Sequence, residues 1–447
     1  MEQRDKLFWI WLAEALGAGS RVFRRLIELY DSPYELFHAD ETEMERIPEL
    51  SARAQKALSD KNLQRAAEIM EVCERNGIGI LTWDDDSYPR LLREINSPPC
   101  VLYYVGELPD WNRLLCVGMV GTRRMSAYGL RTAYKISYEL AAAGAVVVSG
   151  MAAGIDGVCA AAAMAAKGKT VAILGCGVDV VYPSHHRRLR NEIVKRGVIL
   201  SEYPPATRPA AYHFPLRNRL ISGLSQGTVV VEAGVGSGSL ITAKDAILQG
   251  RDVFALPANV GSQGAEGTNG LIRDGAIPVL STDDILENYQ YVFPDTLDSD
   301  AIRTVGNAAR ADLKYLESLG VVELTPPRDS APTLQASPEP PQKSSADGKP
   351  KTPKRRAVKK ESDATATETV QTDSPKASPK KSTPDAVLSS LTPIQLAVLQ
   401  AIPDDRAITA DSLGNLGYPY GDTVAALTML EILGLIQKLP GALYTKS

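Results

Sequence analysis

The sequence predicts an α/β protein built on a doubly wound parallel sheet, with a helical region before the sheet and a small helix-and-strand module at the C-terminus. Apolar runs of strand length alternate with helical stretches between residues 114 and 289, and helical periodicity precedes them. A Pro-, Ser- and Lys-rich stretch then separates the sheet from a second ordered segment. At 447 residues the chain is long enough for two or three domains. The expected divisions are a helical domain at 1–80, the sheet domain at 81–290, a linker at 291–388 and a C-terminal domain at 389–447.

The first 80 residues carry apolar side chains at helical spacing. The N-terminal apolar stretch is short and Glu14 interrupts it, so we expect a core helix of a cytoplasmic protein rather than a leader or a membrane span. LGAGSRVFRRLIELY (16–30) and IPELSARAQKALS (47–59) each read as a turn feeding a helix, as in SAM-like or helix-hairpin-helix modules. The second segment lacks the glycine such modules place between their helices, so a plain helical adaptor stays open.

Seven apolar runs are expected to form strands buried on both faces, because such strands need continuous rather than alternating hydrophobicity. They are LLCVGMVG, AVVVSG, KTVAILG, GVILSEY, GTVVVEA, RDVFALPA and IPVL. Helices are predicted between them at 128–143, 155–167, 186–196 and 240–249. This β–α alternation is typical of a doubly wound parallel sheet.

The C-terminal third divides into a tether and a module. Its middle part is rich in Pro, Ser, Thr, Ala and Lys and has little to bury, which predicts a disordered linker whose charge would also permit DNA binding. Order is expected again from LTPIQLAVLQAI, where Thr392 caps a helix opened by Pro393. Three helices and an apolar hairpin there resemble a winged helix.

The bulk numbers restrict function only weakly. The formal net charge of −4 does not indicate a nucleic-acid-binding protein, so such a site would have to be a local basic patch. The five cysteines are an odd number, widely spaced and without a CxxC pair, so neither a zinc site nor disulfides are expected.

Four glycine-rich turns follow predicted strands: VGTRRMSAYG, VVSGMAAGIDG, ILGCGVDVVYP and VVEAGVGSGSLITA. Ligands of parallel sheets lie at the carboxyl ends of the strands, so the four turns should form one rim. Glycines and helix N-termini there can hold phosphate, with hydroxyls and Arg123 or Arg124 nearby. A single glycine turn could equally serve packing. A P-loop is absent, as is a GxGxxG with an acidic partner at the first turn, which argues against ATP hydrolysis and NAD chemistry, and no cofactor is expected.

The segment YHFPLRNRLISGL (212–224) places aromatic rings beside arginines. Bases can stack on Phe214, and Arg217 and Arg219 can hold phosphates, as single-stranded nucleic acid requires. The alternative is structural: an ion pair from either arginine to Glu202 or Glu232, and core packing of Phe214.

These motifs together resemble the DNA-processing protein A (DprA/Smf) family. VGTRRMSAYG is similar to its GSR turn, SGMAAGID to its SGLARGID motif, and LGCGVDVVYP to its LGCGLDVIYP. The likeness continues through SEYPP, FPLRNRLISGLS and EGTNGLIRDGA and covers about residues 80–285.

The resemblance implies an extended Rossmann-like fold that binds single-stranded DNA without catalysis, forms a homodimer, protects incoming DNA and loads a RecA-type recombinase in natural transformation. Carried over by motif, the implied DNA-binding residues are Gly121, Thr122, Arg123, Ser149, Gly150, Phe214, Arg217, Asn218, Arg219, Ser237, Gly238 and Ser239. The chain departs from the family at Ala153, which replaces an arginine, and near Val158, where a histidine is usual. Residues 185–188 (HHRR) stand where the family's basic groove usually has a lysine.

Two other functions are compatible with the sequence. A nucleotide phosphoribohydrolase of the LOG type shares the core, but its PGGxGTxxE signature is absent. Glu232 precedes the glycine turn, which leaves Asp156 and Glu202 as the candidate acids. A regulator could read duplex DNA through the predicted helix Thr423 to Leu433, but Glu431 is the only charged residue in that span.

Overall fold

The computed structural model describes residues 3–40, 47, 49–262 and 264–323, and in the C-terminal region 391–403, 408–409, 412–413 and parts of 423–446. The chain divides into two compact units, Met1–Ser337 and Pro338–Ser447. The predicted linker between residues 324 and 388 lies outside the described residues. In the part of the chain that is described, no helix combines the length and the apolarity needed to cross a bilayer.

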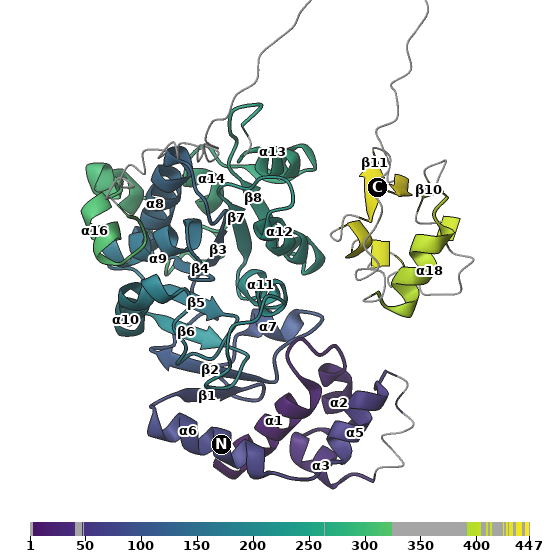
Figure 1. The fold of residues 1–447 in the computed structure, drawn as a ribbon. Coiled ribbons are helices and arrows are strands. Elements are labelled where there is room, and N and C mark those ends of the chain that lie inside the picture. Colours follow the sequence, from purple (N-terminus) through teal and green to yellow (C-terminus); the bar gives the residue numbers. More distant parts are fainter. Residues whose placement is uncertain are drawn as a thin grey trace, which may run out of the picture. The chain divides into compact units, whose positions relative to one another are not determined.

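A nine-stranded sheet forms the centre of the first unit (Figure 1). Its order is β1-β2-β6-β5-β4-β3-β7-β8-β9. The strands are β1 (Gly79–Thr82), β2 (Val101–Gly106), β3 (Cys116–Val120), β4 (Val146–Ser149), β5 (Thr170–Leu174), β6 (Val198–Ser201), β7 (Gly227–Val230), β8 (Asp252–Ala255) and β9 (Ile277–Pro278). From β6 to β9 every neighbouring pair is parallel, which confirms the predicted sheet and its seven strands. The antiparallel strands β1 and β2, which extend the β6 edge, were not predicted.

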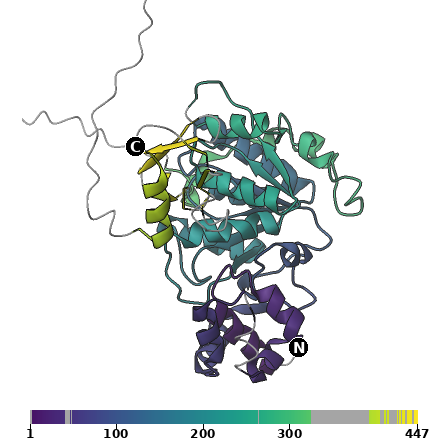
Figure 2. The same ribbon diagram turned by 90° about the vertical axis from the view of Figure 1, so that its right-hand side faces the viewer.

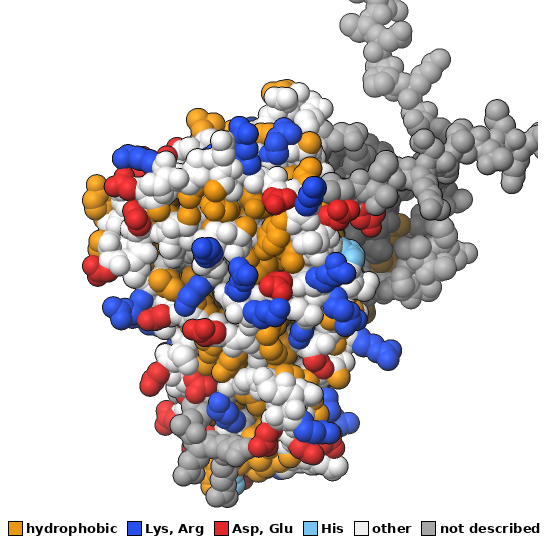
Figure 3. Space-filling view, turned by 90° about the vertical axis from the view of Figure 1, so that its left-hand side faces the viewer, with side chains coloured by type: hydrophobic (Ala, Val, Ile, Leu, Met, Phe, Trp, Pro, Cys, Tyr) orange, Lys and Arg blue, Asp and Glu red, His pale blue; other side chains and the backbone are white. Residues whose placement is uncertain are grey.

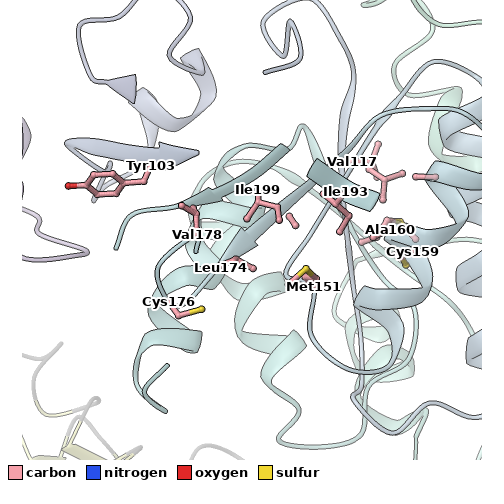
Figure 4. Close-up of a cluster of buried hydrophobic side chains, with 14 of the residues drawn as sticks. Tyr103, Val117, Met151, Cys159, Ala160, Leu174, Cys176, Val178, Ile193 and Ile199 are labelled. Carbon is pink, nitrogen blue, oxygen red and sulfur yellow. The ribbon is translucent and has the colours of Figure 1, made fainter. Parts of the chain in front are cut away.

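Helices cover both faces of this sheet. One layer holds α8 (Ala127–Ala142), α9 (Ile155–Ala165) and α10 (Arg187–Arg196), and the other holds α7 (Arg90–Glu94), α11 (His213–Gly223) and α12 (Gly238–Leu248). Further along are α13 (Glu266–Arg273) and α14 (Asp283–Leu286). Alternate strand residues face the two layers: Val117 and Val147 belong to the cluster with α8 and α9, Val146 and Val148 to the cluster with α11 and α12. Figure 4 shows part of the first cluster, where Val117 lies near Cys159 and Ala160 of α9.

The chain reverses its direction of winding at β3. From β3 it proceeds to β4, β5 and β6 on one side and later returns to β7, β8 and β9 on the other. The turns after β3 and β7 therefore diverge at the carboxyl end of the sheet, where a crevice is expected in doubly wound folds.

The N-terminal helices pack against the β1 edge of the sheet (Figures 1 and 2). They are α1 (Gln3–Leu16), α2 (Phe23–Tyr30), α3 (Pro33–His38), α5 (Ala52–Ser59) and α6 (Gln64–Arg75). Trp9 and Phe23 belong to the same buried cluster as Tyr103 of β2, so the helices share one continuous core with the sheet. The likeness to SAM-like or helix-hairpin-helix modules stays a prediction.

Residues 291–323, assigned above to a linker, are folded, so that part of the prediction is wrong. They form α15 (Ala301–Val305), a short 3-10 turn and α16 (Leu313–Ser318). Leu316, Leu319 and Val321 are buried in the cluster that includes α8 and α9. The overall composition of 291–388 hid these apolar residues, whose burial stabilises the packing of α16.

The C-terminal unit contains α18 (Pro393–Ala401) and the strands β10 (Ile408–Thr409), β11 (Ile436–Leu439) and β12 (Leu443–Lys446), in the order β10-β12-β11. Thr392 caps α18 as predicted, in a capping box with Gln395. The predicted helix Thr423 to Leu433 is described only in part, and the winged-helix assignment stays a prediction.

Candidate functional site

A cavity of about 490 Å³, which we call the rim cavity, lies at the carboxyl end of the sheet. Its walls come from the turn after β3, the start of α9, and the N-terminal turns of α11 and α12. Eight of the twelve residues implied by the resemblance line it: Gly121, Arg123, Phe214, Arg217, Asn218, Ser237, Gly238 and Ser239. Residues from 121 to 239 therefore meet in one hollow, as the converging glycine turns predict.

A cation and two rings form one exposed side of the rim cavity. The guanidinium carbon of Arg123 lies 5.5 Å from the centroid of the Phe214 ring, and the centroids of Phe214 and Tyr182 are 5.2 Å apart. Tyr182 is 38% exposed, so its ring is open to solvent. Sequence reasoning missed Tyr182 as a site residue, although it stands in the YP pair that ends the glycine turn after β5.

Arg217 lies at the floor of the cavity. It is 4% exposed, and its Nη1 donates a hydrogen bond to the Ile173 carbonyl. Burial lowers the pKa of Arg217 and raises the pKa of Asp156, while the attraction between the two opposes both shifts. The Nε–H of Arg217 has no hydrogen-bond partner among the described residues. A Cβ on Gly150 would lie 1.9 Å from Nη1, so only glycine there leaves room for the guanidinium.

The N-terminus of α12 closes one side of the rim cavity. The hydroxyls of Ser237 and Ser239 are 2.8 Å apart, and Asn218 donates from Nδ2 to the Gly238 carbonyl over 3.2 Å. No side chain caps this helix. Its first N–H groups and its dipole therefore favour an anion at the cavity wall.

Arg219, which was also predicted for the site, has structural partners. It lies outside the rim cavity, with its Nη2 2.7 and 2.8 Å from the two carboxylate oxygens of Glu202 and its Nε donating to Ser97 over 3.1 Å. Both partners are buried, at 8% and 9% side-chain exposure. The structural alternative, an ion pair to Glu202, is what the fold contains, because Arg217 and Arg219 point to different sides of α11.

Three other predicted site residues do not line the rim cavity. Ser149 is 1% exposed, and its hydroxyl donates to the Met119 carbonyl over 2.7 Å. The Thr122 hydroxyl accepts from the Arg124 backbone N–H over 3.2 Å and does not line the cavity. Gly150 lines a smaller adjoining hollow of about 70 Å³ together with Arg123, Tyr182, Phe214 and Arg217.

Glu232 and the candidate acid Glu202 have partners away from the rim cavity. Glu232 is 8% exposed, and its Oε2 accepts from the backbone N–H and the hydroxyl of Ser126 over 2.9 and 3.1 Å. Glu202 is bound by Arg219 and also accepts the Gly19 N–H over 3.0 Å. Asp156 lines the cavity, but its carboxylate accepts the N–H groups of Gly150 and Ala152 over 3.1 and 3.4 Å.

Charge elsewhere on the first unit is mixed. On the face shown in Figure 3, Lys and Arg side chains lie among Asp and Glu rather than forming one continuous basic patch. In the HHRR segment, His186 is fully buried with its Nδ1 3.1 Å from the Met151 carbonyl, whereas Arg187 and Arg188 are exposed. Burial lowers the pKa of His186 to about 4, so this residue adds no charge near neutral pH.

Comparison with known proteins agrees with this architecture. The model of the family described as DNA recombination-mediator protein A matches residues 79–290. Protein Smf of Synechocystis sp. is 35% identical over 350 residues, which is 75% of this chain and 87% of the relative. DNA processing protein DprA of Bacillus subtilis is 38% identical over 251 residues, 55% of this chain and 84% of that protein. The X-ray structure of DNA processing protein A from Streptococcus pneumoniae matches with a TM-score of 0.55 and 31% identity, over 63% of this chain and 97% of that one. The chain therefore belongs to the DNA recombination-mediator protein A (DprA/Smf) family.

Proposed function

We propose that this protein binds single-stranded DNA in the rim cavity and acts as a recombination mediator rather than as an enzyme. The observation that carries the proposal is the contact of Phe214 with both Arg123 and Tyr182, beside the open N-terminus of α12. Family membership supports a role in DNA processing and recombination.

The chemistry of the cavity fits an unpaired strand. Phe214 and Tyr182 offer ring faces to a base, and a base can stack on them only when it is not paired within a duplex. Arg123 and the first N–H groups of α12 can take phosphate oxygens, while the hydroxyls of Ser237 and Ser239 add donors. Since stacking and phosphate contacts do not read base edges, sequence preference should be weak.

The geometry favours binding over hydrolysis. Cleavage of a glycosidic bond needs a carboxyl group that can exchange a proton with the substrate. Asp156, Glu202 and Glu232 each accept hydrogen bonds from protein groups, and Glu202 is held in a buried ion pair. We therefore place the LOG-type phosphoribohydrolase second.

The proposal for the cellular role is supported by the family and not by the geometry. We propose that the protein acts in the cytoplasm, protects incoming DNA and loads a RecA-type recombinase during natural transformation, as a homodimer. Ile247 and Leu248 of α12 are 61% and 66% exposed and suit a subunit contact.

Fluorescence anisotropy of the full chain tests this function, with a labelled single strand compared with a duplex of the same sequence. Phe214→Ala should weaken single-strand binding about 5- to 150-fold, corresponding to about 1–3 kcal/mol for one stacked base. The matched control is Tyr291→Ala. It removes a ring that is 87% exposed and that lines neither the rim cavity nor the smaller hollow beside it. Equal affinity for single strand and duplex, or normal binding by Phe214→Ala, would refute the proposal.

A further inference from the structure

A second cavity of about 370 Å³, the N-terminal cavity, lies where the N-terminal helices meet α11. Its walls are the α1–α2 turn, the start of α5, and Tyr203, Tyr212, His213 and Leu216. The rim cavity is lined by Ala211, Phe214 and Arg217 from the same stretch of chain. The two cavities are thus adjacent and share the first turns of α11 as a common wall.

We propose that the N-terminal cavity binds the continuation of the DNA strand held in the rim cavity, so that one strand is bound on both sides of the start of α11. This inference rests on the proposed function and extends it to a contact surface on the N-terminal helices. Three features of the cavity support it: an exposed ring, an unpartnered hydroxyl and an unpaired arginine.

The exposed ring is that of Tyr212, which is 72% accessible to solvent. It packs edge-on against His213 with 4.4 Å between ring centroids, and His213 in turn stacks on Tyr203 at 4.1 Å. His213 is held by its Nδ1, which lies 3.0 Å from the Gly175 carbonyl. A single exposed tyrosine is common on protein surfaces, but a ring supported by a fixed neighbour is a ready platform for a base.

The unpartnered hydroxyl belongs to Tyr203. This side chain is only 8% exposed and lines the N-terminal cavity, yet its hydroxyl oxygen is buried without a hydrogen-bond partner among the described residues. Buried tyrosine hydroxyls usually have a partner. The hydroxyl oxygen is closed to solvent, so the ring must turn towards the cavity before a phosphate oxygen or a base carbonyl can accept its O–H.

The charge of the cavity also suits a phosphate. Arg53 lines it, is exposed, and has no ion pair within the described part of the chain. The one acid in its lining, Glu14, lies 3.6 Å from Arg65, which offsets its charge. Burial raises the pKa of Glu14, and the neighbouring Arg65 opposes that shift.

The glycine turn between α1 and α2 fixes the cavity rather than binding the ligand. The Gly17 N–H donates to the Ala13 carbonyl over 2.9 Å and the Gly19 N–H to Glu202 over 3.0 Å, so neither is available to a phosphate. A Cβ on Gly19 would lie 2.4 Å from Leu216 of α11, which shows how closely the turn packs there. We therefore expect side chains to make the DNA contact. In a helix-hairpin-helix module, the turn between the helices would make it.

The test compares oligothymidines of about 6 and about 20 nucleotides, because only the longer strand should fill both cavities. Tyr212→Ala and Tyr203→Phe should weaken binding of the long strand at least about fivefold and leave the short strand within about twofold of the parent. Tyr203→Phe removes only a hydroxyl that has no protein partner, so it should fold normally. Arg53→Ala should lower the salt slope for the long strand by about 0.7.

Tyr291→Ala and Arg75→Ala are the controls, since both remove exposed side chains outside the two cavities. Unchanged long-strand binding by all three variants would overturn the inference, and so would equal losses at both lengths, which would place these residues in the rim cavity. If Phe214→Ala weakens both strands while the three variants bind normally, only the second contact fails. If the parent binds neither strand, both proposals fail. If the three variants bind DNA normally but lose binding to a recombinase, the cavity is assigned to a protein partner instead.

Discussion

The buried ion pair between Arg219 and Glu202 allows a test of whether Arg219 stabilises the fold or binds DNA. Arg219→Ala would leave Glu202 with only the Gly19 N–H and Coulombic attraction from more distant cations, inside a site where both side chains are less than a tenth exposed. Breaking a buried pair from one side costs about 3–5 kcal/mol. At about 2–4 °C per kcal/mol for a folded unit of a few hundred residues, the Tm should fall by about 6–20 °C.

Differential scanning calorimetry of the full chain measures this change, and anisotropy well below the lowered Tm measures DNA binding. We expect the salt slope of single-strand binding to match that of the parent, because Arg219 does not line the rim cavity. The double variant Glu202→Gln with Arg219→Met keeps an acceptor for the Gly19 N–H and removes both charges, so its Tm should lie above that of Arg219→Ala. An unchanged Tm together with a reduced salt slope in Arg219→Ala would refute the structural assignment.

Two further predictions concern Gly150, beside the floor of the rim cavity, and the buried His186. Gly150→Ala should weaken single-strand binding about 10- to 150-fold by displacing the Arg217 guanidinium, because loss of a charge-assisted hydrogen bond costs about 1.5–3 kcal/mol. The control is Gly270→Ala, whose Cβ would have no neighbour within 4 Å. Normal DNA binding by Gly150→Ala would contradict the prediction. Burial holds the pKa of His186 at about 4, below the 6.5 of an unburied histidine, so the unfolded chain binds more protons between these values and stability falls as the pH drops from about 6.5 towards 4. Urea unfolding should show a smaller loss between pH 7 and pH 5 for His186→Asn than for the parent, and an equal loss would exclude His186 as a cause.

The sequence predicted the sheet well because its strands are continuous apolar runs with few alternatives. A strand covered by helices on both faces has no polar side. Continuous apolar runs such as GTVVVEA and AVVVSG between predicted helices therefore indicate buried strands. The convergence of the glycine turns followed from the same topology, since parallel strands bring all their carboxyl ends to one edge. The strands β1 and β2 were not predicted because they lie outside the repeated β–α alternation, and their antiparallel pairing with each other and with β6 depends on tertiary contacts.

The sequence by itself thus determined the parallel sheet, the edge where the site lies and the family, all of which depend on local patterns and motif order. The tertiary structure decided which side chains reach that site. Arg217 and Arg219 are two residues apart, and on a helix such residues face about 200° away from each other, so one lies under the rim cavity and the other binds Glu202. Likewise, Tyr182 meets Phe214, and the N-terminal helices meet α11, only through contacts between segments far apart in the chain. Such contacts depend on the packing of the whole unit, which no local pattern encodes.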